Sequence, residues 1–134
     1  LPYWKTSNRY LFSGGSVNMR DAAVYAKEEN WSKAVELWKQ TYETKKGKQK
    51  MYAAYNTALG YEMQDSIDTA LEWALKAQTL AREKSKTDKK ETGEIHDGTI
   101  SYYIFISMYV DELEKRKEGM ARLNMQMNRF DDDF

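Results

Sequence analysis

The sequence predicts an all-α fold of stacked helical hairpins, with a long C-terminal capping helix and an extended aromatic N-terminal arm. Three observations predict it. The chain has one proline in 134 residues, at position 2, so every later segment is free to be helical. Apolar residues recur at spacings of three and four along most of the chain, which is the period of an amphipathic helix. Two stretches 36 positions apart repeat one pattern of small, aromatic and turn residues, and such a repeat indicates hairpins that stack to bury their apolar faces.

The N-terminal arm covers residues 1–15 and has no helical period. Its large apolar residues are mostly aromatic, and it ends at the pair Gly14-Gly15, which favours a break in structure. We expect the arm to be extended. Its rings should lie across the helices, because aromatic residues near a terminus fill a core more often than they bind a ligand.

The first hairpin is expected over residues 16–46. Ser16 or Asn18 can cap its first helix, which should end at Glu29, because their side-chain oxygens accept bonds from free backbone amides. A second helix should follow from Trp31 to Thr44. Its inward residues are expected to be Ala34, Val35, Leu37, Trp38, Thr41 and Tyr42.

The second hairpin is expected over residues 49–84, with helices over 49–63 and 66–84. Asp65 and Ser66 stand at the start of the later helix, where they suit both its cap and its dipole. The inward residues of that helix are expected to be Ile67, Ala70, Leu71, Ala74, Leu75 and Gln78.

Residues 85–96 are predicted to be a solvated, charged loop, because seven of the eleven residues in 84–94 are charged and none is large and apolar. A C-terminal helix is expected over 97–130. Its seam residues alternate in spacing between three and four: Tyr103, Ile106, Val110, Leu113, Lys117, Met120, Asn124 and Met127. We expect its first half to be buried and its second half to be more open, with a break near Gly119.

The repeated pattern resembles that of the tetratricopeptide repeat family. AAVYAKEENWSKAVELW and ALGYEMQDSIDTALEWALKA each match the family's small residue, aromatic, turn, Ala and aromatic positions, and the match covers residues 18–82. The leading Trp and the closing Pro of the family are absent, and Ala74 stands where a large aromatic is usual, with Trp73 beside it. The resemblance implies two stacked hairpins that hold a peptide on the face of their first helices.

The wider arrangement is similar to the C-terminal half of a family of uncharacterised exported lipoproteins of Bacteroides-like bacteria. The features that carry this similarity are PYW and RYLF near the start, a Gly-Gly-Ser step, repeats with NW and EWALKA, and the long C-terminal helix. The resemblance implies a periplasmic or outer-membrane-associated parent protein, with a β-rich domain and a lipidated N-terminus before Leu1.

Composition excludes several function classes. Twenty-one basic and 21 acidic residues give zero formal net charge, so we expect no nucleic-acid partner. The absence of cysteine excludes disulfide scaffolds and thiolate metal sites. No apolar run reaches the roughly 18 residues of a membrane span.

No residue pattern points to catalysis, a metal or a cofactor. The single histidine, His96, has only Asp97 beside it, and the acidic run Asp131 to Asp133 lacks the glycine turn and closing glutamate of a calcium loop. We therefore predict that the chain is not an enzyme.

The remaining candidate site is the peptide-holding face that the family resemblance implies. Its residues would be Met19, Arg20 and Lys27 in the first hairpin and Tyr52, Tyr55, Asn56, Leu59, Glu62 and Met63 in the second. Asn56 matches an asparagine of the family's peptide-carboxylate clamps, but Met19 and Ala23 replace the cooperating Lys and Asn, so such a clamp is not expected. Tyr52, Tyr55 and Met63 fit ligand contact and burial under the C-terminal helix equally well.

The sequence therefore predicts a non-catalytic module of a larger protein that binds a protein or peptide. The alternative is a structural brace, or an oligomerisation element that associates through the C-terminal helix. A third hypothesis, an accessory domain of a glycan-acting enzyme, rests on Tyr and Trp content alone.

Overall fold

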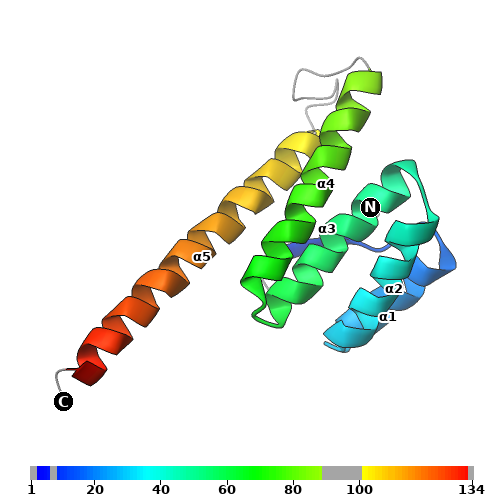
Figure 1. Ribbon diagram of the computed structural model, residues 1–134. Coiled ribbons are helices and arrows are strands. Elements are labelled where there is room, and N and C mark those ends of the chain that lie inside the picture. The colour runs from blue at the N-terminus through cyan, green and yellow to red at the C-terminus, as the bar shows by residue number, and fades with distance from the viewer. Residues whose placement is uncertain (1–2, 7–8, 89–100, 133–134) are drawn as a thin grey trace.

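The computed structural model describes residues 3–6, 9–88 and 101–132. These residues are almost entirely helical, which confirms the all-α prediction. They form five helices, and each helix packs on the next one along the chain (Figure 1). The helices are α1 (Val17–Lys27), α2 (Trp31–Thr44), α3 (Gly47–Met63), α4 (Ile67–Asp88) and α5 (Tyr102–Asp132).

The N-terminal arm is extended but folds back on itself, which the sequence did not predict. Strands β1 (Tyr3–Thr6) and β2 (Arg9–Phe12) pair antiparallel, with Tyr3 opposite Phe12. Strand β2 also contacts α3, and Leu11 and Phe12 are buried there. The arm thus contributes apolar side chains to the helical core.

Helix α1 begins after the side chain of Ser16, whose Oγ accepts a hydrogen bond from the Met19 amide at 3.4 Å. Helix α2 begins after Asn30, whose Oδ1 accepts from the Lys33 amide at 3.3 Å. Both caps satisfy amides that would have no partner inside the helix. Within α2, Trp38 is fully buried whereas Trp31 is only partly buried.

Helix α3 lies at the centre of the molecule, and every residue from 51 to 60 is buried. It begins at Gly47, before the expected start at residue 49. At Gly60 an added Cβ would lie 2.4 Å from Val35 Cγ2 of α2, so the two helices approach at this point closely enough to require glycine.

Three expectations about the second half of the chain were wrong. Helix α4 continues to Asp88, so residues 85–88 are helical and not part of a loop. In α4 Leu75 is 43% exposed, and the neighbouring Trp73 is buried in its place. Helix α5 runs through Gly119 without a break, because nothing approaches this glycine and the loss of helix propensity alone does not end a helix. The rest of the charged loop, with His96, lies outside the described residues.

The two halves of α5 differ as expected. Ile106, Val110 and Leu113 are buried, and α4 is the main neighbour of this helix. Beyond them α5 extends away from the other helices (Figure 1), and Met120, Leu123 and Met127 are exposed. Among the described helices, none combines the length and apolar character that crossing a membrane requires.

Candidate polypeptide-binding site on the third helix

The candidate site is the side of α3 that faces strand β2. Asn56 and Tyr55 project from the middle of α3, and Glu62 projects two turns further along it. All three side chains are buried, so the helix presents polar groups to the strand from inside the core. Buried polar groups need partners, and the strand and α5 supply them.

Asn56 binds the main chain of β2 with both ends of its amide. Its Nδ2 donates to the Phe12 carbonyl at 2.6 Å, and its Oδ1 accepts from the Phe12 amide at 3.0 Å. The side chain therefore offers β2 the donor and acceptor pair that a neighbouring strand would offer. Next to it, the Tyr55 hydroxyl donates to the Tyr10 carbonyl at 2.5 Å. These contacts recognise backbone and do not depend on the side chains of the strand.

An aromatic pocket around Phe12 adds selectivity for one side chain. The Phe12 ring stacks on Tyr52 with centroids 4.1 Å apart and meets the edges of Tyr55, Tyr102 and Phe105. The Tyr52 and Tyr102 hydroxyls lie 2.7 Å apart in a hydrogen bond that joins α3 to α5. Helix α5 thus closes the pocket that α3 opens.

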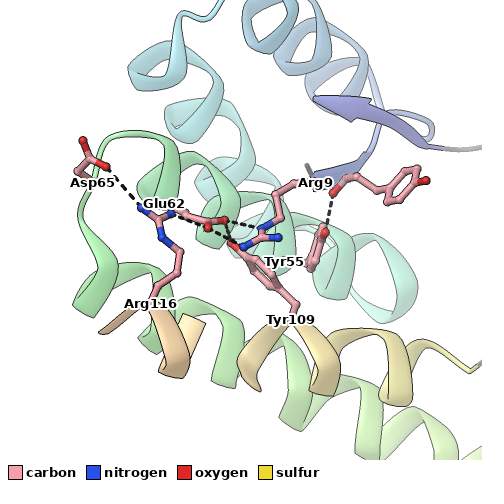
Figure 2. Close-up of polar contacts among 7 residues, drawn as sticks. Arg9, Tyr55, Glu62, Asp65, Tyr109 and Arg116 are labelled. Atoms are coloured by element: carbon pink, nitrogen blue, oxygen red, sulfur yellow. Dashed lines mark hydrogen bonds and ion pairs between the residues drawn. The ribbon is translucent and has the colours of Figure 1, made fainter. Parts of the chain in front are cut away.

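The Glu62 carboxylate joins β2, α3 and α5. Arg9 of β2 donates to both of its oxygens at 3.1 Å, Arg116 of α5 donates to Oε2 at 2.7 Å, and Tyr109 donates to Oε1 at 2.9 Å. Figure 2 shows the two guanidinium groups approaching the carboxylate from opposite sides. Arg116 also lies 3.7 Å from Asp65 Oδ1. The carboxylate is 2% exposed, so these donors replace its hydration.

The network determines the charge state of its members. Burial by itself raises the pKa of Glu62, but the hydrogen bonds from Arg9 and Arg116 outweigh burial and hold this pKa below its ordinary value. Burial and the negative charge of Glu62 raise the pKa of the Tyr109 hydroxyl, so it stays protonated and donates. Glu62 is therefore an anion whose oxygens are all engaged, which suits it for holding elements together.

One family model, described as a domain of unknown function (DUF6340), matches residues 20–115, more than two thirds of the chain. The chain belongs to the DUF6340 family. No curated protein and no solved structure matches it significantly. The DUF6340 match begins in α1 and ends in α5, so it includes the site residues on α3 and Tyr109, whereas Arg9 and Arg116 lie outside the matched range.

The structure brings together five of the residues that the sequence proposed for this face. They are Tyr52, Tyr55, Asn56, Leu59 and Glu62, which all lie buried on α3. Met63 is partly buried at the end of the same helix. In the first hairpin Met19 is buried in the core, while Arg20 and Lys27 are exposed on α1 and take no part in the contacts with β2 described above.

The sequence did not identify the partners of Glu62. Arg9 and Arg116 stand 53 and 54 positions from it, and no local pattern connects residues so far apart. A signal was nevertheless present, because a glutamate within an otherwise apolar helix requires a buried cation from elsewhere in the chain. Within the described residues, no three His, Cys, Asp or Glu side chains are grouped as a metal site would need.

Proposed function

We propose that this chain is a non-catalytic, tetratricopeptide-like helical module that binds an extended polypeptide segment on α3, and that its own strand β2 occupies this site. The observation that carries the proposal is the double hydrogen bond between the Asn56 amide and the Phe12 main chain. Binding through main-chain groups in an aromatic pocket is how proteins hold extended peptides.

The packing order of the helices supports the repeat architecture. Helix α1 packs on α2, α2 on α3 and α3 on α4, as expected for two stacked hairpins, and α5 then covers α4. Two hairpins are fewer than the roughly three that repeat proteins need for stability, so the proposal gives α5 the role of the missing cap.

The chemistry of the site supports a non-catalytic role. Glu62, whose pKa is shifted from its ordinary value, is bound by Arg9, Arg116 and Tyr109, so it cannot act as a base without breaking that network. Tyr55 has a raised pKa because it is buried, and its hydroxyl is bound to the Tyr10 carbonyl. Neither group is available to a substrate.

The proposal is tested by separating the strand from the helices. A chain that lacks residues 1–13 is mixed with a fluorescent peptide of residues 3–13, and binding is measured by anisotropy. We expect saturable binding. Asn56→Ala in the shortened chain should weaken it about thirtyfold, because two buried hydrogen bonds are lost and each contributes on the order of 1 kcal/mol.

Asn18→Ala is the matched control, because Asn18 is only partly buried on α1 and bonds only to Gln40 among the contacts described for it. A shortened chain that is helical by circular dichroism but binds no peptide would contradict the proposal. If the shortened chain does not fold, the proposal is tested by hydrogen exchange of the Phe12 amide in the full chain. Asn56→Ala should then remove protection of the Phe12 amide, and a Phe12 amide that stays protected would overturn the proposal.

A second candidate function is association through the distal part of α5. Met120, Leu123 and Met127 follow one another at helical spacings of three and four, in line with the buried Leu113. The apolar side of α5 thus continues past the end of the bundle, where water covers it. This geometry favours an oligomerisation element, which is the alternative that the sequence also raised.

A further inference from the structure

A second surface, distinct from the α3 site, combines lysines with aromatic rings from three helices. Tyr42 of α2 and Trp73 of α4 meet edge to face with centroids 4.9 Å apart. Around them lie lysines from α2, α3 and α4. We call this group the lysine–aromatic cluster, and its members are Lys39, Tyr42, Lys50, Tyr61, Trp73 and Lys76.

Each ammonium group of the cluster lies near one or two of the rings. Lys50 Nζ lies 4.5 Å from the Tyr42 ring centroid, and Lys76 Nζ lies to one side of both rings, 5.8 Å from the centroid of Tyr42 and 4.0 Å from that of Trp73. Lys39 Nζ lies 5.8 Å from the Trp73 ring centroid. It also donates a hydrogen bond to the Tyr61 hydroxyl at 2.7 Å. The rings attract the three ammonium groups by cation–π interaction.

No carboxylate of the described residues forms an ion pair with these lysines, although some lysines elsewhere in the chain have one. In α4 and α5, Lys86 and Lys115 each pair with a glutamate one turn away. Glu36, Glu43 and Glu72 stand at the same helical spacings from Lys39 or Lys76. Yet within the described part of the chain no carboxylate lies within ion-pair distance of Lys39, Lys50 or Lys76. The three ammonium groups therefore have no ion-pair partner among the described residues.

The adjoining sequence increases this charge. Lys45 and Lys46 lie in the connection from α2 to α3, just before Lys50, and both are exposed. The chain has no formal net charge, so this concentration of lysines creates a local positive field on a neutral protein. Such a field attracts an anionic partner and orients its approach.

We propose that the lysine–aromatic cluster binds an acidic segment of a partner protein. Asp and Glu carboxylates would pair with the ammonium groups, and apolar side chains between them would contact the partly buried rings of Tyr42 and Tyr61.

The rings argue against a nucleic acid as the partner. Trp73 is buried and its face is covered by Lys76, so no base can stack on it. Single-stranded nucleic acid binds on open aromatic faces, and Trp73, the largest ring of the cluster, does not offer one. Lysine without arginine also lacks the bidentate geometry that phosphate recognition favours.

The test uses the full chain and a short fluorescein-labelled peptide of glutamates flanking two phenylalanines. We expect saturable binding by anisotropy that weakens as salt increases. Lys39→Gln and Lys76→Gln should each weaken binding about twofold to fivefold, as expected for the loss of one exposed ion pair, and the double variant should weaken it further. Thermal melts establish that each variant is folded.

Lys33→Gln is the matched control, because Lys33 is exposed on α2 outside the cluster and the substitution removes the same charge. Its binding should equal that of the parent chain. Equal weakening by Lys33→Gln would show diffuse attraction and overturn the proposal. So would equal binding of a peptide with glutamine in place of glutamate, tighter binding of oligothymidine than of the acidic peptide, or no binding of the acidic peptide.

Discussion

At the scale of single residues, the Glu62 carboxylate ties the N-terminal strand, the central helix and the C-terminal helix to one another. Each of its donors comes from a different part of the chain or a different turn of α5. A buried charge without its partners is strongly unfavourable, so the network imposes one relative position on all three elements. Its contribution is therefore greater to the specificity of the fold than to the net stability.

Glu62→Gln should destabilise the protein by about 3 kcal/mol, because Arg9 and Arg116 would face each other without an anion between them. Chemical denaturation monitored by circular dichroism measures the loss. Glu118→Gln is the matched control, since that side chain is exposed on α5 and pairs only weakly with Arg122 at 3.9 Å. Equal stability of Glu62→Gln and the parent chain would contradict the role assigned to the network.

The lowered pKa of Glu62 makes the free energy of unfolding depend on pH. The pKa of Glu62 is below its ordinary value in the folded protein, so the folded state holds this proton less tightly than the unfolded state does. Its stabilising contribution is complete above about pH 4.5, the ordinary value, and is lost as the pH falls through the folded pKa. The free energy of unfolding should therefore fall more steeply in acid for the parent chain than for Glu62→Gln. Parallel pH profiles would contradict this prediction.

Gly60 lies where α3 approaches α2 too closely for an added side chain. An alanine Cβ there would meet Val35 Cγ2 at 2.4 Å and Trp38 Cζ3 at 3.3 Å, so α2 and α3 would have to separate. We expect Gly60→Ala to cost about 1 to 3 kcal/mol, as for overpacked cores. Gly119→Ala is the control, because nothing lies within 4 Å of that position, and it should increase helicity without destabilising the protein. Thermal melts of both variants test the pair.

At the scale of elements, α5 serves two purposes along one helix. Its first part closes the aromatic pocket and the Glu62 network, with Ile106 and Leu113 fully buried. Its last part continues the same apolar side into solvent. The helix remains continuous because its backbone bonds are internal and do not depend on what its side chains contact.

A matched pair of leucines distinguishes these two parts. Leu113→Ala should cost about 2 to 5 kcal/mol, because a fully buried side chain is lost from the interface with the bundle. Leu123→Ala should change the stability by less than about 0.5 kcal/mol, since its side chain is 54% exposed. Denaturant titrations at low protein concentration, where association is weak, provide the comparison. A large loss with Leu123→Ala would place the distal helix in the core.

At the scale of the whole molecule, the sequence predicted what local patterns determine. The start of α1 followed from Ser16, one of the two caps expected, and the burial of Trp38 followed from helical periodicity. Leu75 was wrongly expected to face inward, because apolar residues at positions 71, 73, 74 and 75 form a broad side of α4 and periodicity did not decide which of them lie innermost. The pairing of β2 with Asn56 and of Arg9 with Glu62 depends on contacts between residues 44 and 53 positions apart, which no local pattern encodes.

We expect the distal part of α5 to join two copies of the molecule. In an antiparallel pair of these helices, Met120 of one copy would lie near Met127 of the other, and Glu118 would lie near Arg129. The apolar groups of one copy would then face those of the other, and each acidic group would face a basic one. We expect sedimentation of the full chain to show association that grows with concentration, and deletion of residues 120–134 to abolish it. The shortened chain should still melt cooperatively, because Leu113 and the Glu62 network remain in place. A full chain that stays monomeric, and whose deletion variant loses most of its stability, would instead make the distal helix part of the fold.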